Sequence, residues 1–171
     1  MSNNDISSTH AQSVIVALGS NIGEREEFLR KAVEEIQRLV GELKQASSSY
    51  QTAPLLLPGY DGPAVNDYLN MVVEVSTELC PERLLATLLE IEKDLGRNRA
   101  LETSRWMSRV IDLDIIFYGD QIIESETLRI PHPEMHKRDF VLKPLLEIAP
   151  DWKHPRLGKL VSELYDELSN I

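Results

Sequence analysis

The sequence has a single cysteine, Cys80, among its 171 residues. This excludes a framework of disulfide bonds and fits a reducing compartment, so we expect the protein to be cytoplasmic. No apolar run approaches the roughly 20 residues that a membrane-spanning helix requires, so we expect no membrane association. Residues 1–12 lack the basic and then apolar pattern of a signal peptide, and we expect them to form a disordered leader.

Basic residues are also scarce. The chain has 18 lysines and arginines against 28 aspartates and glutamates, which gives a formal net charge of −10. An acidic chain argues against nucleic-acid partners, because general nucleic-acid binding requires a basic surface. Apolar residues make up 42% and charged residues 27%, as in ordinary soluble globular proteins. The length predicts one domain, residues 13–171, which we expect to be monomeric.

Apolar periodicity predicts an alternation of strands and helices along the chain. Expected strands occupy residues 13–18, 43–52, 68–77 and 110–117, with a short return strand at 121–123, and expected helices occupy residues 24–40, 81–95, 140–148 and 160–168. The order strand–helix–strand–strand–helix–strand is the split βαβ plan. We therefore predict an α+β, ferredoxin-like βαββαβ fold: an antiparallel sheet with helices on one face, plus a C-terminal strand and helix as an appendage.

Two acidic residues interrupt the most apolar strand. Asp112 and Asp114 are the exceptions in a segment that is otherwise β-branched, aliphatic or aromatic. Residues two apart in a strand share a face, so both carboxylates point the same way, while Ile111, Leu113 and Ile115 point to the core. Neighbouring carboxylates repel each other and lose hydration, and a hard divalent cation such as Mg²⁺ offsets that cost.

The residues before this strand favour a site for metal and polyphosphate. Arginines precede it at positions 97, 99, 105 and 109 in a chain that is acidic as a whole. Arginines neutralise phosphates and carboxylates hold the metal, so the two clusters together suit a nucleotide substrate. The structural alternative, in which one aspartate faces solvent and the other pairs with an arginine, stays open.

Several motifs, in a fixed order along the chain, carry a resemblance to a known family. They are Gly19-Ser20-Asn21, Tyr50-Gln51-Thr52-Ala53-Pro54-Leu55, Asp67-Tyr68-Leu69-Asn70, Gly96-Arg97-Asn98-Arg99, Arg105-Trp106 with Arg109, Ile111-Asp112-Leu113-Asp114-Ile115, Ile130-Pro131-His132-Pro133, Arg138-Asp139-Phe140 and Pro144-Leu145-Leu146-Glu147-Ile148-Ala149-Pro150. Through these motifs the chain resembles the 6-hydroxymethyl-7,8-dihydropterin pyrophosphokinases of folate biosynthesis.

The resemblance implies Mg²⁺-dependent transfer of pyrophosphate from ATP to the hydroxymethyl group of 6-hydroxymethyl-7,8-dihydropterin, giving the pterin diphosphate and AMP. It also implies that Asp112 and Asp114 hold two Mg²⁺ ions and share the catalytic role with Arg105 and Arg109. Implied ATP contacts are Arg99, Arg105, Arg109, Ile115, His132 and Arg138. Implied pterin contacts are Thr52, Ala53, Pro54, Leu55, Tyr68, Asn70, Trp106 and Phe140.

Two other interpretations stay open at this point. One is a different two-metal enzyme that acts on a phosphoanhydride or phosphodiester; it would share the aspartates but would not need Asn70 or Phe140. The other is a non-catalytic binding module of the same fold, because a fold alone does not settle function. That module would leave the carboxylate pair as an unexplained electrostatic cost.

Overall fold

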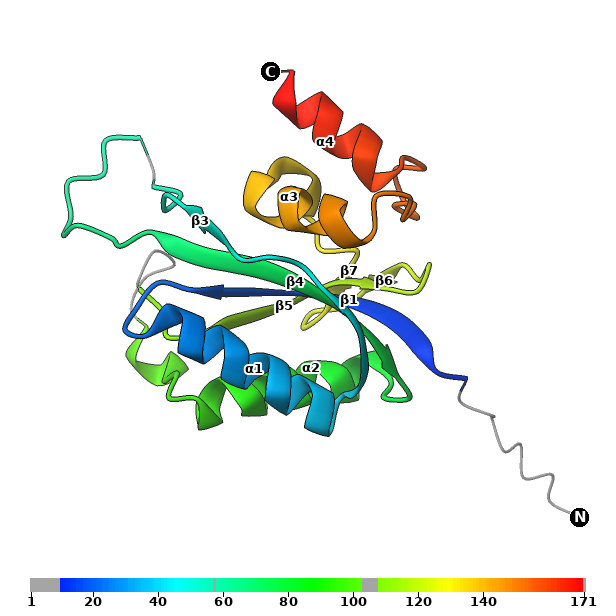
Figure 1. Ribbon diagram of the computed structural model, residues 1–171, viewed down its shortest axis with the longest axis horizontal. Coiled ribbons are helices and arrows are strands. Elements are labelled where there is room, and N and C mark those ends of the chain that lie inside the picture. Colours follow the sequence, from blue (N-terminus) through cyan, green and yellow to red (C-terminus); the bar gives the residue numbers. More distant parts are fainter. Residues whose placement is uncertain (1–9, 57, 103–107, 171) are drawn as a thin grey trace, which may run out of the picture.

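The computed structural model describes residues 10–56, 58–102 and 108–170. Its centre is an antiparallel sheet in the order β2-β4-β1-β5, with β3 paired to β4 as well (Figure 1). The strands are β1 (Gln12–Ser20), β2 (Gly41–Ala46), β3 (Tyr50–Thr52), β4 (Tyr68–Thr77) and β5 (Asp112–Tyr118). This order is that of the split βαβ plan, so the predicted ferredoxin-like fold is confirmed.

The predicted strand over residues 43–52 is in fact two strands. The backbone bends between them at Ser47, whose N–H donates to the carbonyl of Val72 at 2.9 Å. The hydroxyl of Ser47 accepts the N–H of Val72 at 3.0 Å, so a side-chain oxygen replaces a carbonyl in the ladder. Serine hydroxyls compete with regular backbone pairing in this way, which interrupts the strand without losing a hydrogen bond.

Two helices cover one face of the sheet (Figure 1). In α1 (Arg25–Leu39), the buried residues Leu29, Ala32 and Ile36 recur at helical spacing and face the sheet. The second helix, α2 (Pro81–Asp94), begins with a proline, whose missing N–H costs nothing in the first turn. Both helices pack onto one apolar cluster, which includes Val14, Val16 and Leu18 of β1.

The C-terminal part of the chain covers the opposite face of the sheet (Figure 1). Its elements are β6 (Ile123–Glu124), β7 (Arg129–Ile130), η2 (Met135–Lys137), α3 (Asp139–Ile148) and α4 (Val161–Ser169). A short 3₁₀ turn, η1 (Arg99–Leu101), precedes β5. The predicted appendage therefore supplies a second helical layer and a second apolar cluster around Ile15, Phe117 and Leu142. Pro144 lies inside α3, where it removes a single helical hydrogen bond.

Most boundaries differ from the prediction by one or two residues. Gln12, expected in the leader, already pairs with Thr77 at the start of β1. The return strand lies at residues 123–124 and pairs with β7 in a separate two-stranded sheet. Residues 1–9 of the expected leader lie outside the described residues.

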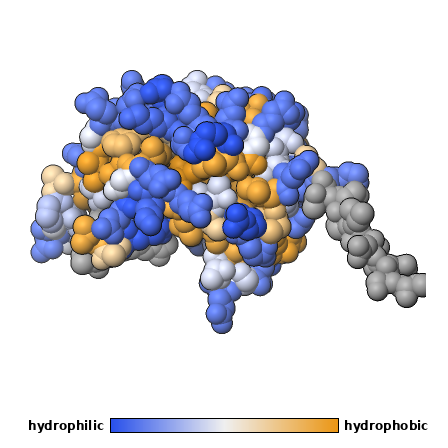
Figure 2. Space-filling model, turned by 90° about the horizontal axis from the view of Figure 1, so that it is seen from below, coloured by the Kyte–Doolittle hydropathy of each residue, from blue (hydrophilic) through white to orange (hydrophobic). Residues whose placement is uncertain are grey.

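The face that carries α1 and α2 has charged side chains interspersed with apolar ones (Figure 2). On α1, Arg30 pairs with Glu27 and Glu34, and Arg38 pairs with Glu35, all one turn apart. Exposed pairs of this kind contribute little to stability individually. Among the described residues, no helix combines the length and the apolar character of a membrane span.

Leu142→Ala should destabilise the protein by about 2–5 kcal/mol, because the substitution leaves a cavity in a core that cannot collapse fully. The side chain of Leu142 is fully buried between α3 and the sheet. Denaturant unfolding followed by circular dichroism would measure the change. Leu157→Ala is the control, since Leu157 is 42% exposed and should lose far less. Equal losses of unfolding free energy in the two variants would contradict the burial of Leu142 in the second apolar cluster.

Candidate active site

Small residues of β1 form the floor of a cavity on the α3 side of the sheet. Gly19 pairs with Asn70 of β4 on one side and with Asp112 of β5 on the other. Ala17 pairs with Asp114 in the same way. A cavity of about 330 Å³ opens above these residues. The sheet thereby holds an amide and two carboxylates at fixed places around one hollow.

Most of the residues that the resemblance predicts for the site border this cavity. They are Thr52, Ala53, Pro54, Leu55, Tyr68, Asn70, Arg99, Arg109, Asp112, Asp114, His132, Arg138 and Phe140. They come from β3, β4, β5, α3 and the segments between, so the fold brings together positions far apart in the sequence.

Three predicted residues are not among those that border the cavity. Arg105 and Trp106 lie outside the described residues. Ile115 is 5% exposed and packs in the cluster under α1 and α2, on the face of β5 opposite the aspartates. Strand alternation explains this placement, since Ile115 is one residue from Asp114. The structure therefore does not support a nucleotide contact through the Ile115 side chain.

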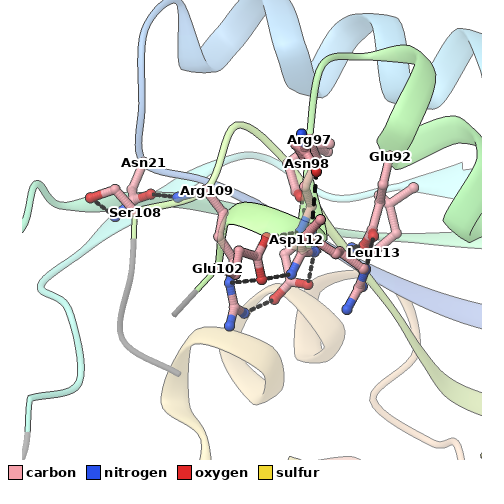
Figure 3. Close-up of polar contacts among 12 residues, drawn as sticks. Asn21, Glu92, Arg97, Asn98, Glu102, Ser108, Arg109, Asp112 and Leu113 are labelled. Carbon is pink, nitrogen blue, oxygen red and sulfur yellow. Dashed lines mark hydrogen bonds and ion pairs between the residues drawn. The ribbon is translucent and has the colours of Figure 1, made fainter. Parts of the chain in front are cut away.

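The two aspartates share a face of β5, as predicted, but have different partners, and Figure 3 shows those of Asp112. Asp112 accepts a hydrogen bond from Arg97 at 2.7 Å on one oxygen and from Arg109 at 3.1 Å on the other. Burial alone would raise the pKa of Asp112, but the charges of Arg109 and Arg97 bring it below its ordinary value. Asp112 is thus held as a carboxylate.

Asp114 has the opposite electrostatic situation. Among the described residues, no hydrogen bond or ion pair with its carboxylate is found within normal distances. Burial, reinforced by the negative charge of Asp112, raises the pKa of Asp114 to about 7. The pair therefore contains one ionised group and one that readily takes a proton in the absence of a cation.

This donor set fits Mg²⁺. A carboxylate oxygen has two acceptor positions, so each Asp112 oxygen keeps one position beside its arginine contact. The described residues contain no cluster of three or more histidine, cysteine or acidic side chains that could hold a metal. Two carboxylates with open positions suit an ion that usually shares its coordination with water and substrate phosphates.

Arginines and a histidine line the remaining wall. The imidazole of His132 accepts the N–H of Glu134 on Nδ1 at 3.2 Å, which leaves Nε2 as the donor of the neutral ring. Burial, assisted by the charge of Arg138, lowers the pKa of His132 to about 4. His132 thus offers a neutral hydrogen-bond donor beside a charged one. Arg138 also lies 5.7 Å from the ring centre of Phe140.

Another part of the cavity lining is polar or aromatic and carries no charge. Asn70 is 6% exposed, and its Nδ2 donates to the hydroxyl of Thr52 at 2.7 Å. That contact fixes the orientation of the amide, while Tyr68 and Phe140 border the same space. An oriented amide between aromatic side chains can read the hydrogen-bonding edge of a flat heterocycle.

Sequence reasoning missed several residues that build the site. Arg97 was seen as part of a basic loop, yet its side chain is 2% exposed and it contacts Glu92, Glu102 and Asp112. The burial of Glu92 could not be predicted from the sequence, because a glutamate beside the apolar stripe of a helix is expected to face solvent. Gly19 carries a detectable signal, because it is a glycine near the end of a strand that is otherwise mostly apolar.

Comparison with known proteins identifies the family of the chain. A family model described as 7,8-dihydro-6-hydroxymethylpterin-pyrophosphokinase (HPPK) matches residues 15–150. The chain belongs to this family. As a member of the HPPK family, the protein is an enzyme, a diphosphotransferase with pyrophosphokinase activity in folate biosynthesis.

Named relatives cover most of the chain. The 2-amino-4-hydroxy-6-hydroxymethyldihydropteridine pyrophosphokinase of Synechocystis is 43% identical over 155 residues, 90% of this chain and 75% of that protein. The Bacillus subtilis protein of the same name is 46% identical over 135 residues, 78% of this chain and 76% of its own. The folic acid synthesis protein fol1 of Pneumocystis carinii is 40% identical over 170 residues, but this chain spans only 22% of its length.

A solved structure shares the fold. The crystal structure of wild-type Plasmodium falciparum HPPK-DHPS with pteroate aligns with a TM-score of 0.70 at 16% identity, covering 94% of this chain and 44% of that chain. At this identity the likeness establishes the fold alone.

Asp114→Asn should stabilise the metal-free protein at pH 8, and Asp112→Asn should destabilise it. The folded pKa of Asp114 is about 7, whereas an unfolded aspartate titrates at about 3.9. The folded state therefore binds more protons between these values, and stability falls as pH rises through that window. Asparagine cannot ionise, so the Asp114→Asn variant does not lose this stability at high pH. Its higher melting temperature relative to wild type should disappear near pH 4, where Asp114 is protonated in the folded wild type.

The effect of Asp112 on stability has the opposite pH dependence, because the pKa of Asp112 is lowered in the folded state. Its charge stabilises the fold above the unfolded pKa, and that stabilisation is lost as pH falls through the folded pKa. Thermal melting of both variants with a chelator, from pH 4 to pH 8, measures the two effects. Melting temperatures that move in the same direction at pH 8 would contradict the assigned electrostatics.

Proposed function

We propose that the protein transfers the diphosphate group of ATP to the hydroxymethyl group of 6-hydroxymethyl-7,8-dihydropterin and releases AMP. The single observation that carries this proposal is the composition of one cavity. An acidic pair and four arginines border one part of it, and an oriented amide with aromatic side chains borders another. A charged polyphosphate and a flat heterocycle can therefore meet in the same space.

The pterin would bind at the amide end. Asn70 presents a donor and an acceptor, which suits the alternating donors and acceptors of a pterin edge. Phe140 and Tyr68 border the same space and can enclose a flat ring, an arrangement that contributes about 0.5–1.5 kcal/mol beyond buried area. Leu55 and Leu56 are largely exposed beside this slot and could cover the ring.

The triphosphate would bind at the charged end. Asp112 and Asp114 would hold Mg²⁺, which supplies charge neutralisation on the phosphates and a lower pKa for the attacking hydroxyl. Arg97, Arg99 and Arg109 border the cavity on the same side as the aspartates. Guanidinium groups in a partly dehydrated site stabilise the charge that develops when the β-phosphorus is attacked and AMP leaves.

No side chain needs to act as a nucleophile in this reaction. The attacking group is a primary alcohol, and phosphoryl-type transfer depends mainly on positioning and charge stabilisation. The rigid strands support this role, since Asp112, Asp114 and Asn70 all extend from the central sheet. His132 would donate a neutral hydrogen bond to a phosphate oxygen from Nε2.

An assay of AMP release from ATP, with and without hydroxymethyl-dihydropterin, tests this proposal. AMP should form only with the pterin. Asp112→Ala should lower turnover by about 10²-fold or more, the size of effect seen when one preorganised electrostatic group is lost. Asp120→Ala is the matched control, because Asp120 lies in the exposed turn after β5. Pterin-independent hydrolysis would favour a different two-metal enzyme, and absence of turnover would favour a binding module.

Gly19→Ala should weaken pterin binding and leave the Michaelis constant for ATP nearly unchanged. The added Cβ would lie 2.9 Å from Oδ1 of Asn70 and 3.6 Å from Tyr68, so the amide must shift. The pterin Michaelis constant should rise by about five- to tenfold, the cost of one disturbed hydrogen bond. Steady-state kinetics measures both constants, and an unchanged pterin constant in a folded variant would contradict the placement of the ring beside Asn70.

A further inference from the structure

A stripe of α3 faces β3 across one side of the cavity. Phe140, Lys143 and Glu147 are three and four residues apart, so they lie on one side of the helix. Phe140 borders the cavity together with Thr52 at the end of β3. Glu147, two helical turns further on, reaches the segment that leads into β3. The helix and the strand therefore meet at both ends of a short interface.

Glu147 makes the polar contacts of this interface. The backbone N–H of Ser48 donates to both of its oxygens, at 3.0 and 3.1 Å. The hydroxyl of Ser48 donates to Oε1 at 3.0 Å, and the hydroxyl of Tyr50 donates to Oε2 at 2.9 Å. The ammonium group of Lys143 lies 5.0 Å from the centre of the Tyr50 ring. One carboxylate thus fixes two residues, and one of these belongs to β3.

Glu147 is held in its charged form. The N–H of Ser48 and then the hydroxyl of Tyr50 lower its pKa, because both donate to the carboxylate. Hydrogen bonds to an ionised acceptor are shorter and stronger than neutral ones. The proposed reaction does not use this carboxylate, and a strand can pack beside a helix without one.

The position of β3 determines the part of the cavity between Thr52 and Phe140, which we call the slot. Tyr50 pairs with Asn70 across the ladder, and Thr52 pairs with Tyr68. The hydroxyl of Thr52 accepts the amide hydrogen bond of Asn70, so a movement of β3 would also turn that amide. Glu147 therefore connects, through Tyr50, to Asn70 and Thr52, which border the cavity.

We infer that Glu147 is a positioning residue that sets the spacing between Phe140 and the Thr52–Leu55 segment, and hence the width of the slot for the flat ring. This inference rests on the proposed function for the identity of the ring. Glu147 does not border the cavity, so it acts only through Tyr50 and Ser48.

Glu147→Ala removes all of these contacts and should raise the pterin Michaelis constant by about tenfold, whereas Tyr50→Phe removes one contact and should raise it by about threefold. Turnover at saturation and the Michaelis constant for ATP should stay within about twofold in both variants, because the charged end is untouched. The double variant should add little to Glu147→Ala, because the Tyr50 hydroxyl then has no carboxylate left to lose.

The control is Glu167→Ala on α4, which removes an exposed ion pair with Lys159, and neither residue borders the cavity. An unchanged pterin constant in Glu147→Ala, or a proportional loss in turnover and both constants, would overturn the inference. If Glu147→Ala does not fold, Tyr50→Phe decides, because its ring keeps the contact with Lys143.

A second measurement separates this inference from the proposed function. Hydrogen–deuterium exchange of residues 48–52 should be faster in Glu147→Ala than in wild type and unchanged in Glu167→Ala. If the wild-type protein released no AMP with the pterin, the proposed function would fail, while the exchange result would still show whether Glu147 holds residues 48–52 in place. Equal exchange in all three proteins would contradict the role of Glu147 in holding residues 48–52.

Discussion

Arg97 carries a positive charge inside the protein, with 2% of its side chain exposed, and three carboxylates surround it. Removing these ions from water costs several kcal/mol each, so the arrangement depends on good geometry and complete hydrogen bonding. Arg97 meets Glu92 at 2.9 Å, Glu102 at 2.6 Å and Asp112 at 2.7 Å (Figure 3). Glu92 in turn accepts the backbone N–H of Leu113 at 2.8 Å.

This network has two structural consequences. It connects α2 to the outer strand of the sheet, because Glu92 belongs to the helix and Leu113 to β5. It also satisfies a backbone donor on an edge strand, which would otherwise be open to pairing with another chain. Asp112 is thereby fixed in position and in charge, which a catalytic carboxylate requires and a flexible surface residue could not provide.

The sequence was sufficient for the fold and for the acidic pair, because both follow from periodicity. Alternation along β5 places Asp112 and Asp114 on one face and the side chain of Ile115 on the other, so the two carboxylates border the cavity and Ile115 packs in the core. The burial of Arg97 could not be predicted, because it depends on the approach of α2 to β5 rather than on any local pattern. The interruption at Ser47 likewise depends on one side-chain hydrogen bond across the ladder.

The site finally reflects an incompletely covered sheet. On the α3 side, β1 carries Ile15, then Ala17, then Gly19. Ile15 is fully buried under the C-terminal helices, while the two smaller residues border the cavity. The second helical layer thus packs where the strand offers bulk and leaves a hollow where it does not. Because α3 begins at that boundary, Phe140 stands at its edge, and the same helix that completes the core also forms a wall of the cavity.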